Sequence, residues 1–591
     1  MDRKLAGAPE EVTEVLIGHR VFGRPASYNP GDDSIVRTEA RTLRQRLERY
    51  FAGDGAAESF VLEIPRGGYL PVFRPRPNLA VASSQLPAES NAGERHSITR
   101  RQWVALGASA LGLTSIGVWA RRRIPLIGTV AGPAAAPASL RLESSDPRLN
   151  AAFQNAKERA MACVFTGDPV GDWYASSKDN LCFCARDTAH ESTGAALLGL
   201  NRHTLNMLRR FAASVTPERD WCAYWKITKD GFPSTFNNED VGGFALPANF
   251  DAMRACLRQL LWTGERQYLD PVFTKFYEHT VTQYVEIWDP DHSGLMHRRP
   301  DRPHVNATYH QEQPHFYTGA DLVAAQYAGY AAYAAIQEIK GGRGSLSQRM
   351  ADDYRRQAAQ VRKRFNTEWW NAAGNRFWAG MLPDHSWYDA YVADSNVYPL
   401  YFAAPDDGAK TESMLDIMEQ NQPGVVGAFT YYPEVLFRFG RNDAAYRYLM
   451  QICDPKFFGY GTSEAPFAAI GAVGTGLVGI RADATQSTVE TLPRLPKALE
   501  WVRLTQVPMA GNQIAVEHRN NGETRFTNQS GPALTWKVSF PVPASQASAG
   551  IFIDGAAAAK LSFEHRANRQ PVISATAPVR PGQSRVAKLV V

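Results

Sequence analysis

The chain has 591 residues, of which 44% are hydrophobic and 21% are charged, an ordinary balance for about two to four globular domains. Its formal net charge of +5 is too small to indicate nucleic-acid binding over the whole chain. Six cysteines in so long a chain exclude a disulfide scaffold, and Cys182 and Cys184 have no second pair at zinc-ligand spacing. We therefore expect a globular protein with no metal and no cofactor.

Residues 1–75 have the pattern of a small unit with one helix and one hairpin. Apolar residues recur at helical spacing in residues 34–51, and Arg37, Arg41 and Arg44 form a basic stripe on another face. Residues 60–73 then alternate between apolar and polar around the turn Arg-Gly-Gly, which predicts a hairpin.

A helix followed by a hairpin with an R-G-G-Y turn resembles the end of a winged-helix domain of the response-regulator type. The resemblance implies DNA contact through residues 34–75. Against this, residues 1–76 contain 12 Lys or Arg and 11 Asp or Glu, so there is no strong basic footprint. The first helices of a complete winged helix are also missing, and we expect a truncated module for which DNA binding is the less favoured interpretation.

An apolar segment follows a polar linker. Residues 76–99 are rich in Pro, Ala, Ser and Asn and cannot bury a core. Within residues 100–124, the 17 residues 103–119 carry no charge, and arginines flank them on both sides. This length is at the short end for a membrane span.

The string S-x-T-R-R-x-W at the start of that segment resembles a twin-arginine export signal, and the small residues of GTVAGPAAAPAS offer a cleavage site. We expect the protein to be exported, periplasmic or anchored in the membrane by residues 103–119. Because 98 residues precede Thr99, the segment would be an internal signal-anchor, or translation would start downstream of Met1.

Residues 139–485 alternate between amphipathic helices and loops rich in Gly, Asp, Trp and Tyr. Short connections at one end and long loops at the other predict a mainly α fold, an (α/α)6 toroid whose inner helices direct their N-terminal loops to a central cleft. The inner helices should be the Ala/Gly-rich ones, such as residues 320–339 and 465–480. Residues 486–591 change to a period of two with Asn-Gly and Gly-Pro turns, which predicts a β-sandwich.

Four stretches of residues 140–591 resemble the six-hairpin glycosidases, which include trehalases, processing α-glucosidases and α-L-rhamnosidases. They are GDWYASSKDNLCFCARDTAHESTGAALLGL, FNNEDVGGFALPANFDAMRACLRQLLWTG, WDPDHSGLMHRRP with YHQEQPHFYTGADLVAAQYAGYAAYAAI, and YGTSEAPFAAIGAVGTGLVGI. The third has the layout of the processing-glucosidase pattern, but His310-Gln311-Glu312-Gln313 stands where that pattern has E-S-G-x-D. The resemblance implies hydrolysis of an O-glycosyl bond without specifying the sugar.

Inverting glycosidases place two carboxyl groups about 6.5–9.5 Å apart across the scissile bond. Glu312 is the predicted general acid, because an aromatic, lysine-free loop should raise its pKa; the alternative is an exposed loop glutamate. Glu464 opens the last inner helix, where the base of six-hairpin enzymes lies, and a helix N-terminus favours its ionised form; the alternative is an N-terminal cap. Glu434 is the second choice for the base, and Glu239 and Asp240 are the second choices for the acid.

Substrate contacts are expected from a helix start and from aromatic side chains. Arg186, Asp187 and His190 surround one helix start and could bind sugar hydroxyls, or alternatively form a structural salt bridge. The predicted stacking residues are Trp173, Trp225, Trp387, Tyr388 and the pair Tyr431-Tyr432. The sequence does not predict a metal cluster, because the loop histidines are irregularly spaced: His292, His297, His304, His310 and His315.

The sequence thus predicts an exported or membrane-anchored glycoside hydrolase, inverting, that acts on an oligo- or polysaccharide. Two alternatives remain open. One is a membrane-anchored sugar-sensing regulator with a non-catalytic toroid, and the other is a polysaccharide lyase or phosphorylase on the same scaffold.

Overall fold

A computed structural model describes short stretches between residues 13 and 75, and residues 139–590 without 177–180, 232, 234–243, 303–304, 310–315, 343, 407, 543–548 and 565–570. The chain divides into two compact units, Met1–Ile127 and Gly128–Val591. Glu312, Glu239, Asp240 and the apolar run 103–119 lie outside the described residues. None of the described helices is long and apolar enough to cross a membrane.

The first unit contains the helix and the hairpin that the sequence predicts. Helix α3 (Ile35–Ala52) is followed by the antiparallel strands β1 (Phe60–Glu63) and β2 (Val72–Pro75). Arg44 donates to the carbonyl oxygens of Ile64 (2.8 Å) and Pro65 (3.1 Å), and so ties the helix to the hairpin. The predicted winged-helix likeness and DNA contact stay predictions.

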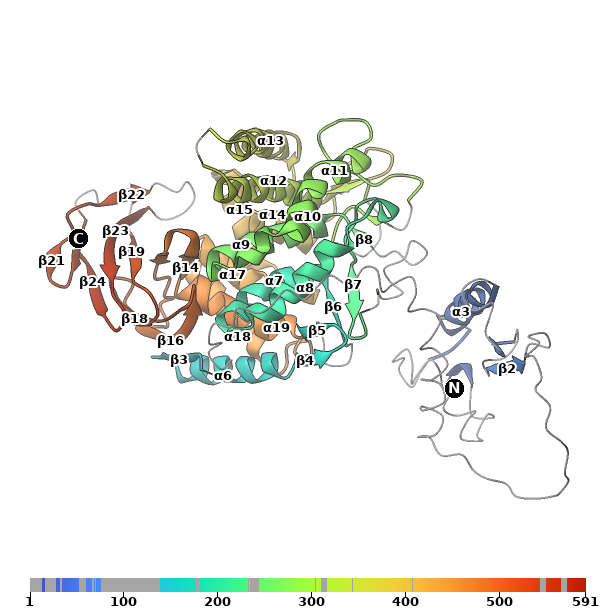
Figure 1. Cartoon of the computed structure of the whole chain (residues 1–591), viewed down its shortest axis with the longest axis horizontal. Helices are drawn as coiled ribbons and strands as arrows, with labels where there is room; N and C mark the ends of the chain where they lie inside the picture. The colour runs from blue at the N-terminus through green and yellow to red at the C-terminus, as the bar shows by residue number, and fades with distance from the viewer. Residues whose placement is uncertain are drawn as a thin grey trace, which may run out of the picture. The chain divides into compact units, whose positions relative to one another are not determined.

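The described part of the second unit contains six helical hairpins, each with one outer and one inner helix (Figure 1). The outer helices are α6 (Pro147–Met161), α8 (Asn201–Ser214), α10 (Pro271–Val281) with α11 (Gln283–Trp288), α13 (Leu346–Glu368), α15 (Ala409–Gln420) and α18 (Asn442–Cys453). The inner helices are α7 (Ala185–Leu197), α9 (Pro247–Thr263), α12 (Ala320–Lys340), α14 (Ala393–Tyr401), α17 (Tyr432–Arg438), which α16 (Val426–Phe429) precedes, and α19 (Glu464–Gly471).

The inner helices form a closed ring. Each packs against the next in chain order, and α19 returns to pack against α7. All eight residues of α19 are buried, whereas α13 buries only one face, which includes Ala351, Ala358, Val361 and Phe365. The predicted toroid and the predicted apolar inner helices are thus confirmed, with α12 starting at Ala320 and α19 continuing as a π-helical turn over Ala472–Leu477.

Among the described toroid helices, side-chain caps occur only on outer helices, although the outer helices α8, α15 and α18 lack them too. Outer helices α6, α10 and α13 start with the side-chain caps Asp146, Asp270 and Ser345. None of the six described inner helices has such a cap. Five of them carry an acid in the first turn, as the outer helices α15 and α18 also do. The acids of the inner helices are Asp187, Asp321, Asp394, Glu434 and Glu464. Free N–H groups and the positive ends of helix dipoles are therefore gathered with these carboxyl groups at one end of the toroid.

Short strand pairs lie in the connections that lead into the inner helices. The pairs are β4 (Val164–Asp168) with β5 (Gly171–Tyr174), β6 (Cys182–Cys184) with β7 (Lys226–Thr228), β8 (Phe244–Ala245) with β9 (Val305–Asn306), and β10 (Thr318–Gly319) with β13 (Gly380–Met381). A fifth pair, β11 (Trp370–Asn371) with β12 (Arg376–Phe377), follows α13.

The C-terminal part is a sandwich of two sheets, as the sequence predicts (Figure 1). One sheet has the strand order β14 (Arg481–Asp483), β15 (Thr488–Thr491), β19 (Leu534–Pro541), β23 (Val572–Val579) and β22 (Ser562–Glu564). The other has the order β21 (Ala556–Ala557), β20 (Gly550–Ile553), β24 (Ser584–Val590), β18 (Glu523–Ser530), β17 (Asn512–Arg519), β16 (Trp501–Met509) and β3 (Arg141–Ser144). Buried Trp536 and Phe526 stack between the sheets at 5.3 Å.

Strand β3 joins the two parts of the unit. It precedes the first toroid helix, yet it pairs antiparallel with β16, with Leu142 opposite Leu504 and Ser144 opposite Val502. The sequence analysis did not predict this strand, because four residues are too few for an alternating pattern to be recognised.

Helices α7 and α19 approach so closely that only glycine fits at their crossing. A Cβ atom at Gly194 would collide with the backbone carbonyl of Phe467. We predict that Gly194→Ala lowers the free energy of unfolding by about 1–3 kcal/mol, because the two helices must move apart. Gly342→Ala is the matched control, since a Cβ there meets no atom within 4 Å. Equal melting temperatures for the two variants would contradict the prediction.

Candidate functional site

Glu464 is buried and is the first residue of α19. Its carboxylate contacts three side chains from other hairpins. Its Oε1 accepts a hydrogen bond from Thr430 Oγ1 at 2.9 Å and lies 3.4 Å from His190 Nδ1. Its Oε2 accepts from Arg186 Nη2 at 3.3 Å. The carboxylate thus joins the first inner helix, α7, to the last one.

These partners keep Glu464 ionised. Burial alone would raise the pKa of the carboxyl group, but the positive charge of Arg186 and the hydrogen bonds from His190 and Thr430 outweigh it and lower the pKa to about 2. Glu464 is therefore a carboxylate throughout the neutral range and cannot serve as an acid there. The catalytic-base role that the sequence suggests for Glu464 stays a prediction.

Arg186 is fixed on several sides. Its Nη2 donates to Asp187 Oδ1 at 2.8 Å, and its Nη1 donates to Tyr398 Oη at 3.3 Å. Tyr398 in turn donates to the carbonyl oxygen of Gly427 at 2.9 Å, and a Cβ at Gly427 would collide with the Arg186 guanidinium. The glycine therefore leaves room for the arginine beside α16.

A ring of tyrosines surrounds this ion pair. The His190 ring stacks on Tyr431 at 3.6 Å, and Tyr431 contacts Tyr398 (5.0 Å) and Tyr401 (4.7 Å) edge to face. Tyr398 also packs against Tyr309 at 5.2 Å. All four tyrosines are buried, so they hold the ion pair in place and offer no exposed face to a sugar.

Three buried carboxyl groups near this ring were not singled out in the sequence. Burial raises the pKa of Asp251, with Arg258 and Arg254 opposing, and burial together with Asp187 holds the pKa of Glu191 well above its usual range. Burial also raises the pKa of Asp321 to about 6. Asp251 accepts from Tyr309 Oη at 3.3 Å, and its Oδ1 has no partner within the described part of the chain.

Asp321 and Glu191 have positioning contacts. Asp321 Oδ2 accepts from the backbone N–H of Tyr309 at 2.5 Å and so holds the loop before β10. Glu191 Oε1 accepts from Ser463 Oγ at 2.7 Å, directly before Glu464. Acids at the starts of apolar helices were the signal that could have identified Asp321 in the sequence, whereas Glu191 and Asp251 lie a full turn inside their helices.

Glu434 lies close to the site but is engaged elsewhere. It is paired with Arg438 at 2.5 Å on the same helix. Burial raises its pKa, but Arg438 and Arg258 outweigh this and lower it overall. Glu434 therefore belongs to an arginine-rich cluster around Tyr401, to which Arg254, Arg258 and Arg438 donate.

The predicted stacking residues have different surroundings. Trp173 is fully buried between Phe165 (4.8 Å) and Phe183 (5.7 Å) and has no exposed face for a sugar. Trp387 packs against Trp369 and Trp378, and Tyr388 packs against Phe316. Trp225 is only partly buried and lies 6.0 Å from Tyr309, which places it next to the tyrosine ring.

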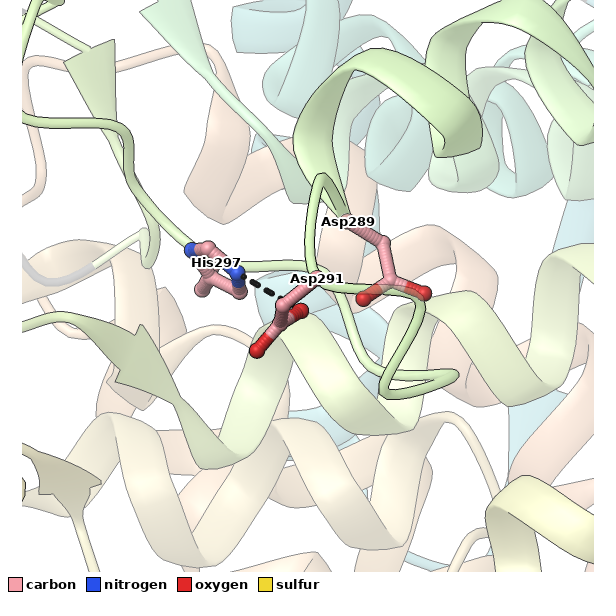
Figure 2. Close-up of side chains that lie close together, drawn as sticks. All are labelled: Asp289, Asp291 and His297. Atoms are coloured by element: carbon pink, nitrogen blue, oxygen red, sulfur yellow. Dashed lines mark hydrogen bonds and ion pairs between the residues drawn. The ribbon is translucent and has the colours of Figure 1, made fainter.

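One group of side chains in the described part of the chain has metal-ligand spacing. The ligand atoms of Asp289, Asp291 and His297 all lie within 4.8 Å of one another (Figure 2). His297 Nε2 lies 3.2 Å from Asp291 Oδ1, and Asp289 accepts from the backbone N–H groups of Ser293 (2.9 Å) and Gly294 (2.8 Å). Burial and the neighbouring Asp291 raise the pKa of Asp289. These bonds close the loop after α11, and all three side chains are hydrogen-bonded within the protein.

The fold is similar to that of solved α-L-rhamnosidases. A GH78 family rhamnosidase from Bacillus sp. GL1 has a TM-score of 0.50 at 17% identity, over 65% of this chain and 40% of the rhamnosidase. An α-L-rhamnosidase from Streptomyces avermitilis, solved with L-rhamnose, has a TM-score of 0.49 at 16% identity, over 76% of this chain and 42% of its own. A putative kojibiose phosphorylase from the human microbiome has a TM-score of 0.46 at 8% identity, over 75% of this chain and 67% of its own.

The chain spans less than half the length of these two rhamnosidases. No family model and no curated protein matches it. At 17% identity, the likeness to the GH78 family rhamnosidase establishes the fold alone, an (α/α)6 toroid, and it confirms the predicted resemblance at that level.

The site predicts a specific stability defect. Arg186→Met leaves the Glu464 carboxylate buried without its cation, which costs about 3–5 kcal/mol of unfolding free energy at neutral pH. Arg356→Met, which removes an exposed ion pair with Asp353, is the control and should cost about 0–1 kcal/mol. Urea unfolding of both variants measures the difference.

The defect should depend on pH. Because the pKa of Glu464 is lowered from 4.5 to about 2 on folding, its contribution to stability is present above pH 4.5 and is lost as the pH falls towards 2. The gap between wild type and Arg186→Met should therefore narrow over that interval. A gap that stays constant would show that Arg186 does not act through Glu464.

Proposed function

We propose that the protein is a glycoside hydrolase in which the Glu464 carboxylate is the catalytic base. The observation that carries the proposal is a single ionised carboxylate at the start of the last inner helix, held by Arg186, His190 and Thr430 within a ring of tyrosines. The support for it is a fixed negative charge beside Arg186, whose side chain is 16% exposed and could reach a sugar hydroxyl.

In the inverting reaction, Glu464 accepts a proton from the water that attacks the anomeric carbon, while a carboxylic acid protonates the leaving oxygen. A bond forms between the water oxygen and that carbon, and the glycosidic bond breaks. The low basicity of Glu464 is compatible with this role, since the transition state resembles an oxocarbenium ion that a nearby carboxylate stabilises. We assign the acid to Glu312, and Asp251, with its raised pKa, is the second choice.

Arg186 and Asp187 are proposed to bind sugar hydroxyls. Their guanidinium and carboxylate offer a donor and an acceptor side by side, and the bond from Arg186 to Tyr398 limits the movement of the guanidinium. An α-L-rhamnoside is the first substrate to test, because two of the similar structures are rhamnosidases. An oligo- or polysaccharide remains the proposed natural substrate.

Glycan cleavage by single-residue variants tests the proposal. We expect Glu464→Gln to lower kcat by about 10²–10⁴ on whichever member of a p-nitrophenyl glycoside and oligosaccharide panel is hydrolysed, and Glu312→Gln to do the same. Glu368→Gln, in an exposed ion pair with Arg364, is the control with unchanged kcat. Proton NMR of the first-formed anomer reports inversion.

Other outcomes would identify the alternatives. Wild-type turnover by Glu464→Gln would refute the assigned base. A glycan that raises the melting temperature without being cleaved would favour the sugar sensor. Products that absorb in the ultraviolet would indicate a lyase, and dependence on inorganic phosphate would indicate a phosphorylase.

We also propose that the toroid acts outside the cytoplasm. The support is the sequence Arg100-Arg101 before the apolar run 103–119. Replacement of both arginines by lysine should leave the full-length chain in the cytoplasmic fraction of a bacterial host with a twin-arginine pathway. Replacement of Arg121 and Arg122 by lysine is the control, and equal export of the two variants would contradict the proposal.

A further inference from the structure

The exposed apolar side chains of the toroid are gathered at one end. Among the described toroid residues, five large apolar side chains are exposed: Leu181, Leu346, Tyr391, Val425 and Phe458. All except Leu346 lie in the segments that lead into an inner helix, on the side where the first-turn acids gather. A random surface distribution would also place such residues on the outer helices and at the other end, and clustered exposed apolar residues commonly mark a binding surface.

Phe458, Val425 and Tyr391 lie around the buried side chain of Phe429. Phe458 is 54% exposed and packs against Phe429 (6.0 Å) and Phe457 (4.7 Å). The neighbouring Gly459 lies against the Val426 side chain, which brings residues 458–459 to residues 425–426. Tyr391 shares a hydrogen bond with Tyr432, whose ring stacks on Phe429 at 6.2 Å.

Helix α16 connects this surface to Arg186 through Val426 and Gly427, which are both partly exposed, as is the Arg186 side chain (16%). Phe429 supports the exposed ring of Phe458, while the next residue, Thr430, donates to Glu464. Gly427, two residues after the exposed Val425, lies against Arg186. A ligand that contacts Arg186 and extends along α16 would therefore lie beside Val425, and residues 458–459 lie next to it.

We propose that Phe458, Val425 and Tyr391 form an outer subsite that binds a second sugar ring of the substrate, with Phe458 as the stacking platform. The inference rests on the proposed function and makes it more specific: the preferred substrate is at least a disaccharide. The Phe458 ring suits this role, because two buried aromatic rings pack against it while the residue stays 54% exposed.

The surroundings of the subsite fit a sugar better than a wholly apolar leaving group. Exposed polar side chains alternate with the apolar ones: Lys456 lies two residues before Phe458, Gln422 three residues before Val425 and Asp389 two residues before Tyr391. A pyranose presents an apolar C–H face and a polar hydroxyl edge. The rings of Phe458 and Tyr391 suit the C–H face, and the polar side chains that precede them in the chain offer donors and acceptors for the hydroxyl groups.

Binding to monosaccharides and to longer glycans tests the subsite. The full-length protein is screened on an array of mono-, di- and trisaccharides, and the affinity for the best oligosaccharide and for its terminal monosaccharide is measured by calorimetry. We expect Phe458→Ala to weaken oligosaccharide binding about tenfold and to leave monosaccharide binding unchanged. Phe458→Trp should restore the affinity, and Leu346→Ala, an exposed apolar residue outside the cleft side, should behave as wild type.

The outcomes separate this inference from the function on which it rests. If the wild-type protein binds no glycan, the proposed function itself fails, and the subsite fails with it. If glycans bind but Phe458→Ala weakens the binding of mono- and oligosaccharides equally, or weakens the binding of neither, only the subsite is refuted. If Phe458→Ala selectively lost binding of p-nitrophenyl monoglycosides, the surface would bind an apolar leaving group, and the subsite would also be refuted. Unchanged melting temperatures confirm that the variants are folded.

Discussion

A carboxylate that stays ionised inside a protein must be matched by a cation, and in this molecule that match is between Glu464 and Arg186. If either charge were buried alone, the free energy of unfolding would fall by several kcal/mol, which is about the cost of removing one partner from a buried ion pair. The two residues are 278 positions apart in the chain, on the last and the first inner helix. The ion pair can therefore form only when the ring of helices closes, and the site depends on that closure.

Closure in turn depends on how near the helices come. Gly194 allows α7 to touch the backbone of α19, and Gly427 makes room for the guanidinium beside α16. A bulkier side chain at the first position would separate the two helices that carry the pair, and one at the second would displace Arg186 itself. Packing density and charge pairing are thus parts of one arrangement, in which a methyl group at a helix crossing could alter the electrostatics of the site.

The sequence specified much of the fold, because hydrophobic periodicity records which face of an element is buried. It predicted the apolar inner helix that α12 forms, the sandwich, and the helix and hairpin of the first unit. It also singled out Arg186, Asp187, His190 and Glu464, because polar residues at the start of apolar helices are conspicuous. It did not identify Asp251, Glu191 or Tyr398, because a polar residue inside a buried helix has the same local pattern whether it faces the toroid axis or a neighbouring helix. Trp173 was misleading for a related reason: aromatic content does not show which ring keeps an exposed face.

Strand β3 gives the second unit an unusual mechanical connection. The chain enters the unit through an edge strand of the C-terminal sheet, so tension from the preceding segment would load the β3–β16 pairing before it reached the toroid. Ser145 continues this attachment through its backbone bond to the Trp501 carbonyl and its side-chain bond from Glu500. During synthesis, β3 leaves the ribosome more than three hundred residues before its partner, and the edge of the sheet remains incomplete until the toroid has been made. A toroid cut away from the sandwich would lose the partner of its first strand, so the two parts are better regarded as one folding unit than as separable modules.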